Sequence, residues 1–208
     1  MNAVKFAVAA VTASFVASAA SAASLSLIGG GYQNQVLANY DLMPDLDGKT
    51  VSFLTGAVKN NTNGLAVSGP ARVTYTYLGS EAGNTNFSAS IGGAWILTQA
   101  SAIGTTFTNT VMSGGLLDFL FATTAPATSI GQIINNGGAN PNSSSFAIGY
   151  YQDGNSWYAL FDDIRTGDRD FDDFALKIDV APIPLPAAGF LLLGGLGALG
   201  AVARRRKA

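Results

Sequence analysis

The sequence predicts an all-β fold, an antiparallel β-sandwich of the jelly-roll kind, for residues 23–181. Short segments in this range alternate polar and apolar residues with a period of two, which is typical of strands with one buried face. Gly- and Asn-rich turn signals separate these segments, and helical periodicity is scarce. About 160 residues are enough chain to bury a hydrophobic core in such a fold.

Residues 1–22 have the three-part pattern of a signal peptide. Lys5 supplies the positive charge, an uncharged Ala- and Val-rich stretch follows over residues 6–17, and Ala20 and Ala22 fit the small-x-small rule for signal peptidase. The apolar stretch is too short for a membrane span. We expect cleavage after Ala22 or Ala23, in preference to the alternative of a buried Ala-rich helix.

Eight or more short strands are expected between the two ends of the chain. The clearest are residues 73–77 and 174–180, in which every second residue is apolar. A continuous apolar run over residues 116–121 predicts a buried strand, and residues 123–145 form the most loop-like stretch. The remaining expected strands are Thr50–Leu54, Thr85–Ile91, Ala94–Thr98, Thr105–Val111, Ser145–Tyr151 and Trp157–Phe161.

Seven of the 13 acidic residues lie between Asp162 and Asp179. Carboxylates packed this closely repel one another unless something neutralises them. Arg165 and Arg169 supply part of the neutralising charge, and a bound Ca²⁺ would supply more because it takes six to eight oxygen ligands. An EF-hand is excluded, because Asp173 stands where its turn needs Gly and the flanking segments read as strands.

The same stretch resembles the C-terminal acidic motif of the DUF4114 family of secreted bacterial domains. The resemblance covers about 20 residues and implies a structural calcium site. Its ligands would be the aspartates at the acidic pair and in the loop, namely Asp162, Asp163, Asp168, Asp170 and Asp173. The alternative is a solvated acidic turn whose charges pair with arginine.

Residues 182–208 form a tail with three parts. Ile183, Pro184, Leu185, Pro186 and Ala187 make a rigid segment that disfavours helix. The uncharged run over residues 185–203 has 19 residues, about 28 Å as a helix, which is enough to span a bilayer core. A terminal basic cluster would hold that end in the cytoplasm by the positive-inside rule; it consists of Arg204, Arg205, Arg206 and Lys207.

The tail resembles the PEP-CTERM sorting signals of Gram-negative bacteria, in their VPLPA-type variant, with Ile183 in place of Val. The resemblance covers about 25 residues. It implies a transient inner-membrane stage, recognition by an exosortase, cleavage near the prolines, and release or attachment at the cell surface. Two alternatives remain: a plain single-pass anchor, and a degenerate sortase motif at residues 185–189 in which Ala stands in place of Thr.

The composition of the chain excludes several classes of catalysis, metal site and partner for the domain. There is no Cys and no His, which excludes Ser-His-Asp and Cys-His catalysis and disfavours zinc and copper sites. Five of the 11 basic residues lie in the two ends, so the middle carries six against 13 acids, a net charge of −7. Nucleic acid needs a basic surface and is therefore not expected as a partner.

We expect a non-enzymatic protein of the cell surface or extracellular matrix, with a structural or adhesive role. The first alternative is a carbohydrate-binding module for exopolysaccharide, in which exposed aromatic residues would stack on sugars; in a sandwich such residues are more often core. The second is a carboxylate-based hydrolase, which would need Glu81 and an Asp across a cleft. The aromatic candidates are Trp95, Tyr150, Tyr151, Trp157 and Tyr158.

Overall fold

The structure is a computed structural model of the whole chain. It describes residues 22–38, 40, 42–55, 62–81, 85–124, 132–137, 140, 146–163, 169–183, 194–200 and 204. Residues 1–21 of the expected leader, Asp168, the motif residues 184–187 and the basic residues 205–207 lie outside the described part. One compact unit spans Ala22–Ile183, and the second consists of Met1–Ser21 and Pro184–Ala208.

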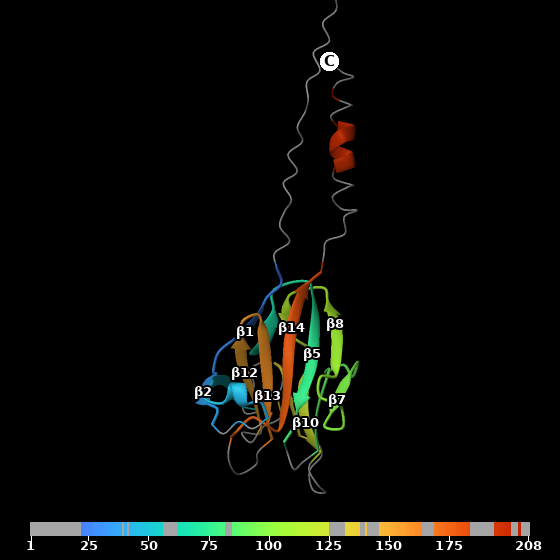
Figure 1. The fold of residues 1–208 in the computed structure, drawn as a ribbon. Helices are drawn as coiled ribbons and strands as arrows, with labels where there is room; N and C mark the ends of the chain where they lie inside the picture. Colours follow the sequence, from blue (N-terminus) through green and yellow to red (C-terminus); the bar gives the residue numbers. More distant parts are fainter. Residues whose placement is uncertain are drawn as a thin grey trace, which may run out of the picture. The chain divides into compact units, whose positions relative to one another are not determined.

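The compact unit 22–183 is built from antiparallel strands, which confirms the predicted fold class at this level (Figure 1). A seven-stranded sheet has the order β2-β3-β12-β13-β14-β5-β8: Gln33–Val36, Thr50–Thr55, Ala147–Asp153, Ser156–Asp162, Phe174–Pro182, Ala71–Gly79 and Thr106–Val111. A four-stranded sheet has the order β11-β10-β6-β7: Gln132–Asn135, Leu120–Thr124, Thr85–Ala89 and Ile96–Thr98. A three-stranded sheet has the order β1-β4-β9: Leu25–Ile28, Gly64–Val67 and Gly115–Leu116.

The strands with clear alternation form as predicted, but one predicted strand is wrong. Along β5, buried residues alternate with more accessible ones, as the period of two requires. The apolar run 116–121 is broken, because residues 117–119 leave the ladder between β9 and β10. Each of the two pieces pairs in a different sheet, so Leu117 and Phe119 are buried without belonging to a strand.

The main hydrophobic core lies where residues of all three sheets meet. Phe121 of β10 is fully buried and stacks on Phe161 of β13, with ring centroids 5.2 Å apart and an interplanar angle of 6°. Its ring also meets the edge of Phe174, at 5.9 Å. Buried aromatic residues of this size account for much of the apolar area that folding removes from water.

A buried asparagine ties the core to the backbone of the three-stranded sheet. The Asn136 side chain accepts from the Leu65 N–H at 2.7 Å and donates to the carbonyls of Leu65 and Leu117 at 2.9 and 2.8 Å. It also accepts from the Tyr150 hydroxyl at 2.8 Å. These four bonds satisfy a polar group that would otherwise be costly to bury.

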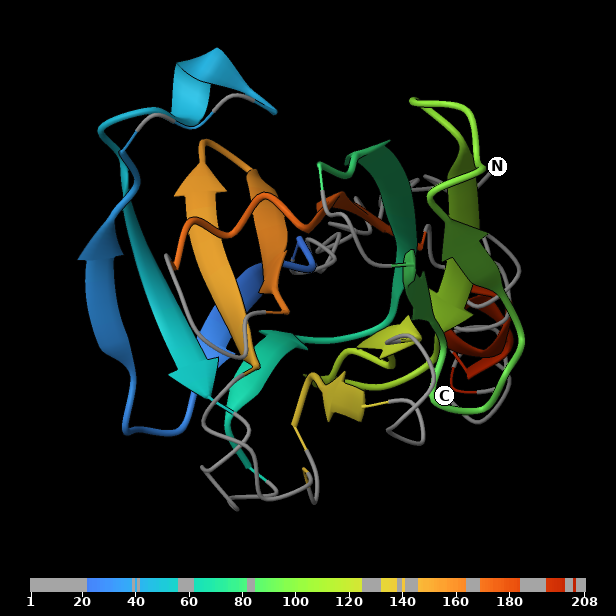
Figure 2. The ribbon, with the colours of Figure 1, turned by 90° about the horizontal axis from the view of Figure 1, so that it is seen from below.

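A second hydrophobic cluster covers part of the opposite face of the seven-stranded sheet. The 3-10 turn η1, Pro44–Leu46, lies on this side of β12 and β13, away from the strands of the four-stranded sheet (Figure 2). Phe171 is fully buried here with φ of 65°, and its ring lies 5.5 Å from that of Phe53. Gly149 makes room for it, since an added Cβ would lie 2.8 Å from the Phe171 ring.

Of the expected membrane span 185–203, the structure describes residues 194–200, which are helical. The side chains of Leu196 and Leu199 are exposed. Among the described residues no helix has both the length and the apolar character to cross a membrane.

Candidate functional site

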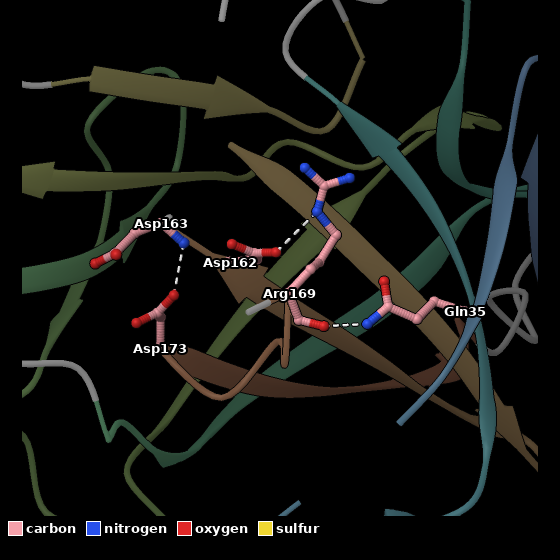
Figure 3. Close-up of polar contacts among 5 residues, drawn as sticks. All are labelled: Gln35, Asp162, Asp163, Arg169 and Asp173. Atoms are coloured by element: carbon pink, nitrogen blue, oxygen red, sulfur yellow. Dashed lines mark hydrogen bonds and ion pairs between the residues drawn. The ribbon is translucent and has the colours of Figure 1, made fainter. Parts of the chain in front are cut away.

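The acidic segment connects β13 to β14, and the structure describes its residues 162–163 and 169–173. Asp162 is the last residue of β13, and Asp163 follows it with its carboxylate on the other side (Figure 3). This alternation divides the predicted ligands. Asp162 faces Arg169, and these two residues form the first half of the segment. Asp163 lies beside Asp173, and these two form the second half.

Arginine neutralises the first half of the segment. The Asp162 carboxylate is fully buried and accepts from Arg169 Nε at 3.1 Å in an ion pair (Figure 3). The Arg169 guanidinium lies over the Phe53 ring, 5.0 Å from its centroid. Gln35 of β2 donates to the Arg169 carbonyl and ties the loop to the edge of the sheet. Arginine pairing, one of the two alternatives for this segment, therefore applies to Asp162.

Asp163 and Asp173 form the second half, and both carboxylates are buried. The Asp163 N–H donates to Asp173 Oδ2 at 2.6 Å (Figure 3). Asn86 of β6 donates to Asp163 Oδ2 at 2.6 Å and to the Asp173 carbonyl at 3.3 Å. Ser80 also donates to that carbonyl. Residues far apart in the sequence thus hold two carboxylates side by side.

Burial first, and neighbouring negative charge second, raise the pKa values of two aspartates of the acidic segment, Asp173 and Asp172. Burial, opposed by the Asp163 N–H bond, raises the pKa of Asp173 to about 7, and the carboxylates of Asp163, Asp162 and Asp170 raise it too. Burial also raises the pKa of Asp172 to about 8, with further contributions from hydrogen bonding to Asp170 and from its negative charge. Both groups therefore hold protons at a pH where an ordinary aspartate is ionised.

Glu81 belongs to the same neighbourhood. Its N–H donates to the Asp172 carbonyl at 3.0 Å, and its negative charge raises the pKa of Asp172 further. Burial raises the pKa of Tyr40, and so do the charges of Asp172 and Asp170. None of the three pockets described below is lined by Glu81.

Three buried oxygen atoms near the acidic segment or on the neighbouring strands have no hydrogen-bond partner in the part of the chain that the structure describes: Asn86 Oδ1, Thr123 Oγ1 and Asp170 Oδ1. Asn86 and Thr123 are directly opposed on β6 and β10. Buried polar atoms are nearly always satisfied, so each unsatisfied one needs an explanation. Within the described residues no group of three or more Asp, Glu, His or Cys side chains is arranged around a metal position.

Sequence reasoning located the acidic segment but missed Asn86 and Thr123. Both residues belong to a strand pair in the four-stranded sheet, and no local pattern connects them with a loop some 40 to 80 residues further on. The only available signal is polarity: Asn86 and Ser88 share the buried face of β6, whereas the apolar Phe87 between them points to the other face. A polar residue on a buried face is the feature to notice.

The aromatic candidates divide into two groups. Trp95, Trp157 and Tyr150 are core residues, as residues of this kind in a sandwich usually are. Tyr151 and Tyr158 are half-exposed and line a pocket of about 450 Å³ together with residues around η1. The other two pockets lie beside Leu117, about 440 Å³, and beside Trp157, about 270 Å³.

Of the predicted sorting and basic residues, the structure describes Ile183 and Arg204. Ile183 follows β14 directly and ends the compact unit, and Arg204 is exposed.

Comparisons with protein-family models, with curated proteins and with solved structures find no match for this chain.

Proposed function

We propose that this chain is an exported, non-enzymatic protein of the cell surface or extracellular matrix. Signal peptidase removes residues 1–22, and an exosortase of a Gram-negative inner membrane processes the tail near Pro184–Ala187 after a transient stage in which residues 185–203 span the bilayer. The mature domain is a β-sandwich of jelly-roll type, and calcium stabilises its acidic segment.

The observation that carries the export proposal is where the compact unit ends. It spans Ala22–Ile183. The cleavage site argued from the leader lies after Ala22 or Ala23, and the proline motif begins at Ile183. Two boundaries derived from processing signals thus agree, within a residue or two, with the limits of the folded unit. Removal of both ends would leave the β-structure whole.

The sandwich proposal is supported by the division of the hydrophobic residues. The larger cluster contains buried side chains from all three sheets, among them Phe121, Trp157 and Leu65. The smaller cluster lies on the other side of the seven-stranded sheet under η1. Inner faces that meet across one core are typical of sandwiches.

Calcium fits the second half of the acidic segment. The carboxylates of Asp163 and Asp173 offer oxygen atoms, and so do the buried Asn86 Oδ1 and, on the strand opposite, Thr123 Oγ1. Hard cations prefer oxygen ligands. We propose Asp163, Asp170 and Asp173 as ligands, with Asp168 outside the described residues and Asp162 engaged by Arg169. A bound cation would favour the ionised forms of Asp172 and Asp173, whose pKa values are raised by burial and by the neighbouring carboxylates.

The sorting proposal is tested by expressing the chain in a bacterium that has an exosortase and in the strain that lacks it. We expect surface-exposed or released protein in the first strain and retention in the membrane fraction in the second. Replacing both Pro184 and Pro186 by Ala should mimic the deletion, whereas Pro70→Ala, in an exposed turn, should have no effect. Equal distribution in the two strains would contradict the proposal.

The calcium proposal is tested by thermal unfolding with calcium and with EDTA. We expect EDTA to lower the melting temperature, and the double variant Asp168→Ala/Asp170→Ala to abolish that response. Asp45→Ala is the matched control because Asp45 is exposed on η1. An identical melting curve with and without EDTA would show that no cation stabilises the segment.

A further inference from the structure

The accessible face of the seven-stranded sheet carries a row of polar and aromatic side chains across five strands. The register opposes Tyr151 to Tyr158, Tyr158 to Lys177, Lys177 to Thr76, and Thr76 to Thr106. Directly opposed residues point to the same face, and none of these five is buried. With strands about 4.8 Å apart, the row is about 19 Å long.

A second row runs beside the first. Asp153 is opposed to Ser156, Ser156 donates to Asp179 at 2.6 Å, and Asp179 is opposed to Thr74. Thr74 in turn is opposed to Thr108, and their hydroxyls lie 3.1 Å apart. The two rows contain hydroxyl, carboxylate and ammonium groups and two tyrosine rings, and no aliphatic side chain.

The tyrosines stand at one end of this surface, in the pocket beside η1. The Tyr151 and Tyr158 rings are 6.0 Å apart and inclined by 41°. Asp153 and, from the η1 side, Asp45 and Lys49 add charged groups to the lining. Its volume of about 450 Å³ lies within the range of small-ligand sites, which combine apolar surface with a few polar groups that fix orientation.

The Tyr151 and Tyr158 rings are not needed to fill the main hydrophobic core. The residues next to them in β12 and β13, Tyr150 and Trp157, point to the opposite face and are buried in the main core. Tyr151 and Tyr158 pack only partly on the smaller cluster and keep accessible surface. An accessible ring with a hydroxyl at its edge offers an apolar face and a polar handle to a ligand.

We infer that this face binds a neutral oligosaccharide, with one sugar ring in the Tyr151–Tyr158 pocket and the following rings along the two rows. A sugar presents C–H groups to aromatic faces and hydroxyls to carboxylates, ammonium groups and threonine hydroxyls. Of the charged groups on this face, Lys177 pairs with Asp179 at 3.2 Å. Arg72 of β5 is exposed on the same face, but in the pocket itself Asp45 and Asp153 outnumber Lys49, so an anionic sugar ring is disfavoured there.

This inference is independent of the route of export, because it concerns binding by the folded domain. The site lies on residues of β12, β13 and η1, and its rings are Tyr151 and Tyr158, whereas Trp157 is buried.

The test is titration calorimetry of the full-length protein with four neutral hexasaccharides: of cellulose, laminarin, amylose and mannan type. An anionic hexauronate is the fifth probe. We expect at least one neutral probe to bind and the hexauronate to bind more weakly. Tyr158→Ala should weaken binding by about tenfold or more, which corresponds to about 1.4 kcal/mol. Tyr158→Phe, which keeps the ring, should change affinity by less than about threefold by the same conversion.

Matched variants separate loss of the site from loss of the fold. Tyr151→Ala and Thr76→Val remove a second ring and a distant hydroxyl from the same surface, and both should weaken binding while circular dichroism stays unchanged. Ile96→Ala, an exposed apolar residue of the four-stranded sheet, should bind as the unmodified chain does. No binding by any neutral probe, preference for the hexauronate, or affinity insensitive to both tyrosine truncations would overturn the inference.

Discussion

In the absence of calcium, replacing Asp173 by asparagine is expected to stabilise the protein at pH 8 and to destabilise it near pH 4. Asp173 is 7% exposed, and its pKa is raised from an ordinary value of 3.8 to about 7, chiefly by burial. A raised pKa means that the folded state favours the protonated form. The resulting stability is complete below pH 4 and is lost as the pH rises through 7.

The magnitude follows from the size of the shift. About three pH units at about 1.4 kcal/mol each give an upper limit of about 4 kcal/mol, by which the ionised carboxylate destabilises the fold at pH 8. Asparagine removes the charge and keeps an oxygen that can accept from the Asp163 N–H. Because its amide also adds two donors to a buried site, we expect a net gain of about 2 kcal/mol.

The assay is urea unfolding in EDTA, followed by the fluorescence of the buried Trp95 and Trp157, at pH 8 and at pH 4.5. The difference between Asp173→Asn and the unmodified chain reports the ionisation of Asp173 together with its effect on the neighbouring Asp172. Asp45→Asn, on the exposed η1 turn, should have no effect at either pH. An Asp173→Asn variant that is less stable at pH 8 would refute the reasoning.

Three further substitutions test the packing. Phe121→Ala, which removes a fully buried ring that stacks on Phe161, should lower the free energy of unfolding by about 3–5 kcal/mol in urea titration. Gly149→Ala should lower it by about 1–3 kcal/mol, since the new methyl group would overlap the Phe171 ring, and equal stability would show that this ring can move. Asn136→Ala should destabilise by about 2 kcal/mol or more, because the Leu65 N–H and other groups lose their partners, and calorimetric melting would show no change if water replaces them.

The alternation in the sequence was sufficient to predict the strands that have one apolar face, such as β5 and β14. It could not predict which sheets the two pieces of residues 116–121 join. Asp118 interrupts this apolar run, and it lies in the stretch 117–119 that belongs to no strand, but the partners of β9 and β10 depend on pairing in two separate sheets. Short strands such as β1 and β4 have too few residues for a period to emerge, and only their mutual pairing defines them.

The candidate site was predictable in position but not in detail. Seven acids in one segment mark it in the sequence. Which carboxylate pairs with Arg169 depends on how side chains alternate at the end of β13. Asp162, the last residue of the strand, points toward Arg169, and Asp163, the next residue, points toward Asn86. Asn86 lies 77 residues before Asp163, and only the folded arrangement of β6 beside the end of β13 brings them together. Contacts at such sequence separation leave no local pattern.

The most direct test of the proposed export and sorting is the intact mass of the mature protein from a host that has an exosortase. We predict an N-terminus at residue 23 or 24 and a C-terminus between Pro184 and Ala188, so that the compact unit Ala22–Ile183 remains nearly complete. A mass that includes residues through Lys207 would contradict processing of the tail and favour a plain anchor, and an N-terminus at Met1 would contradict export.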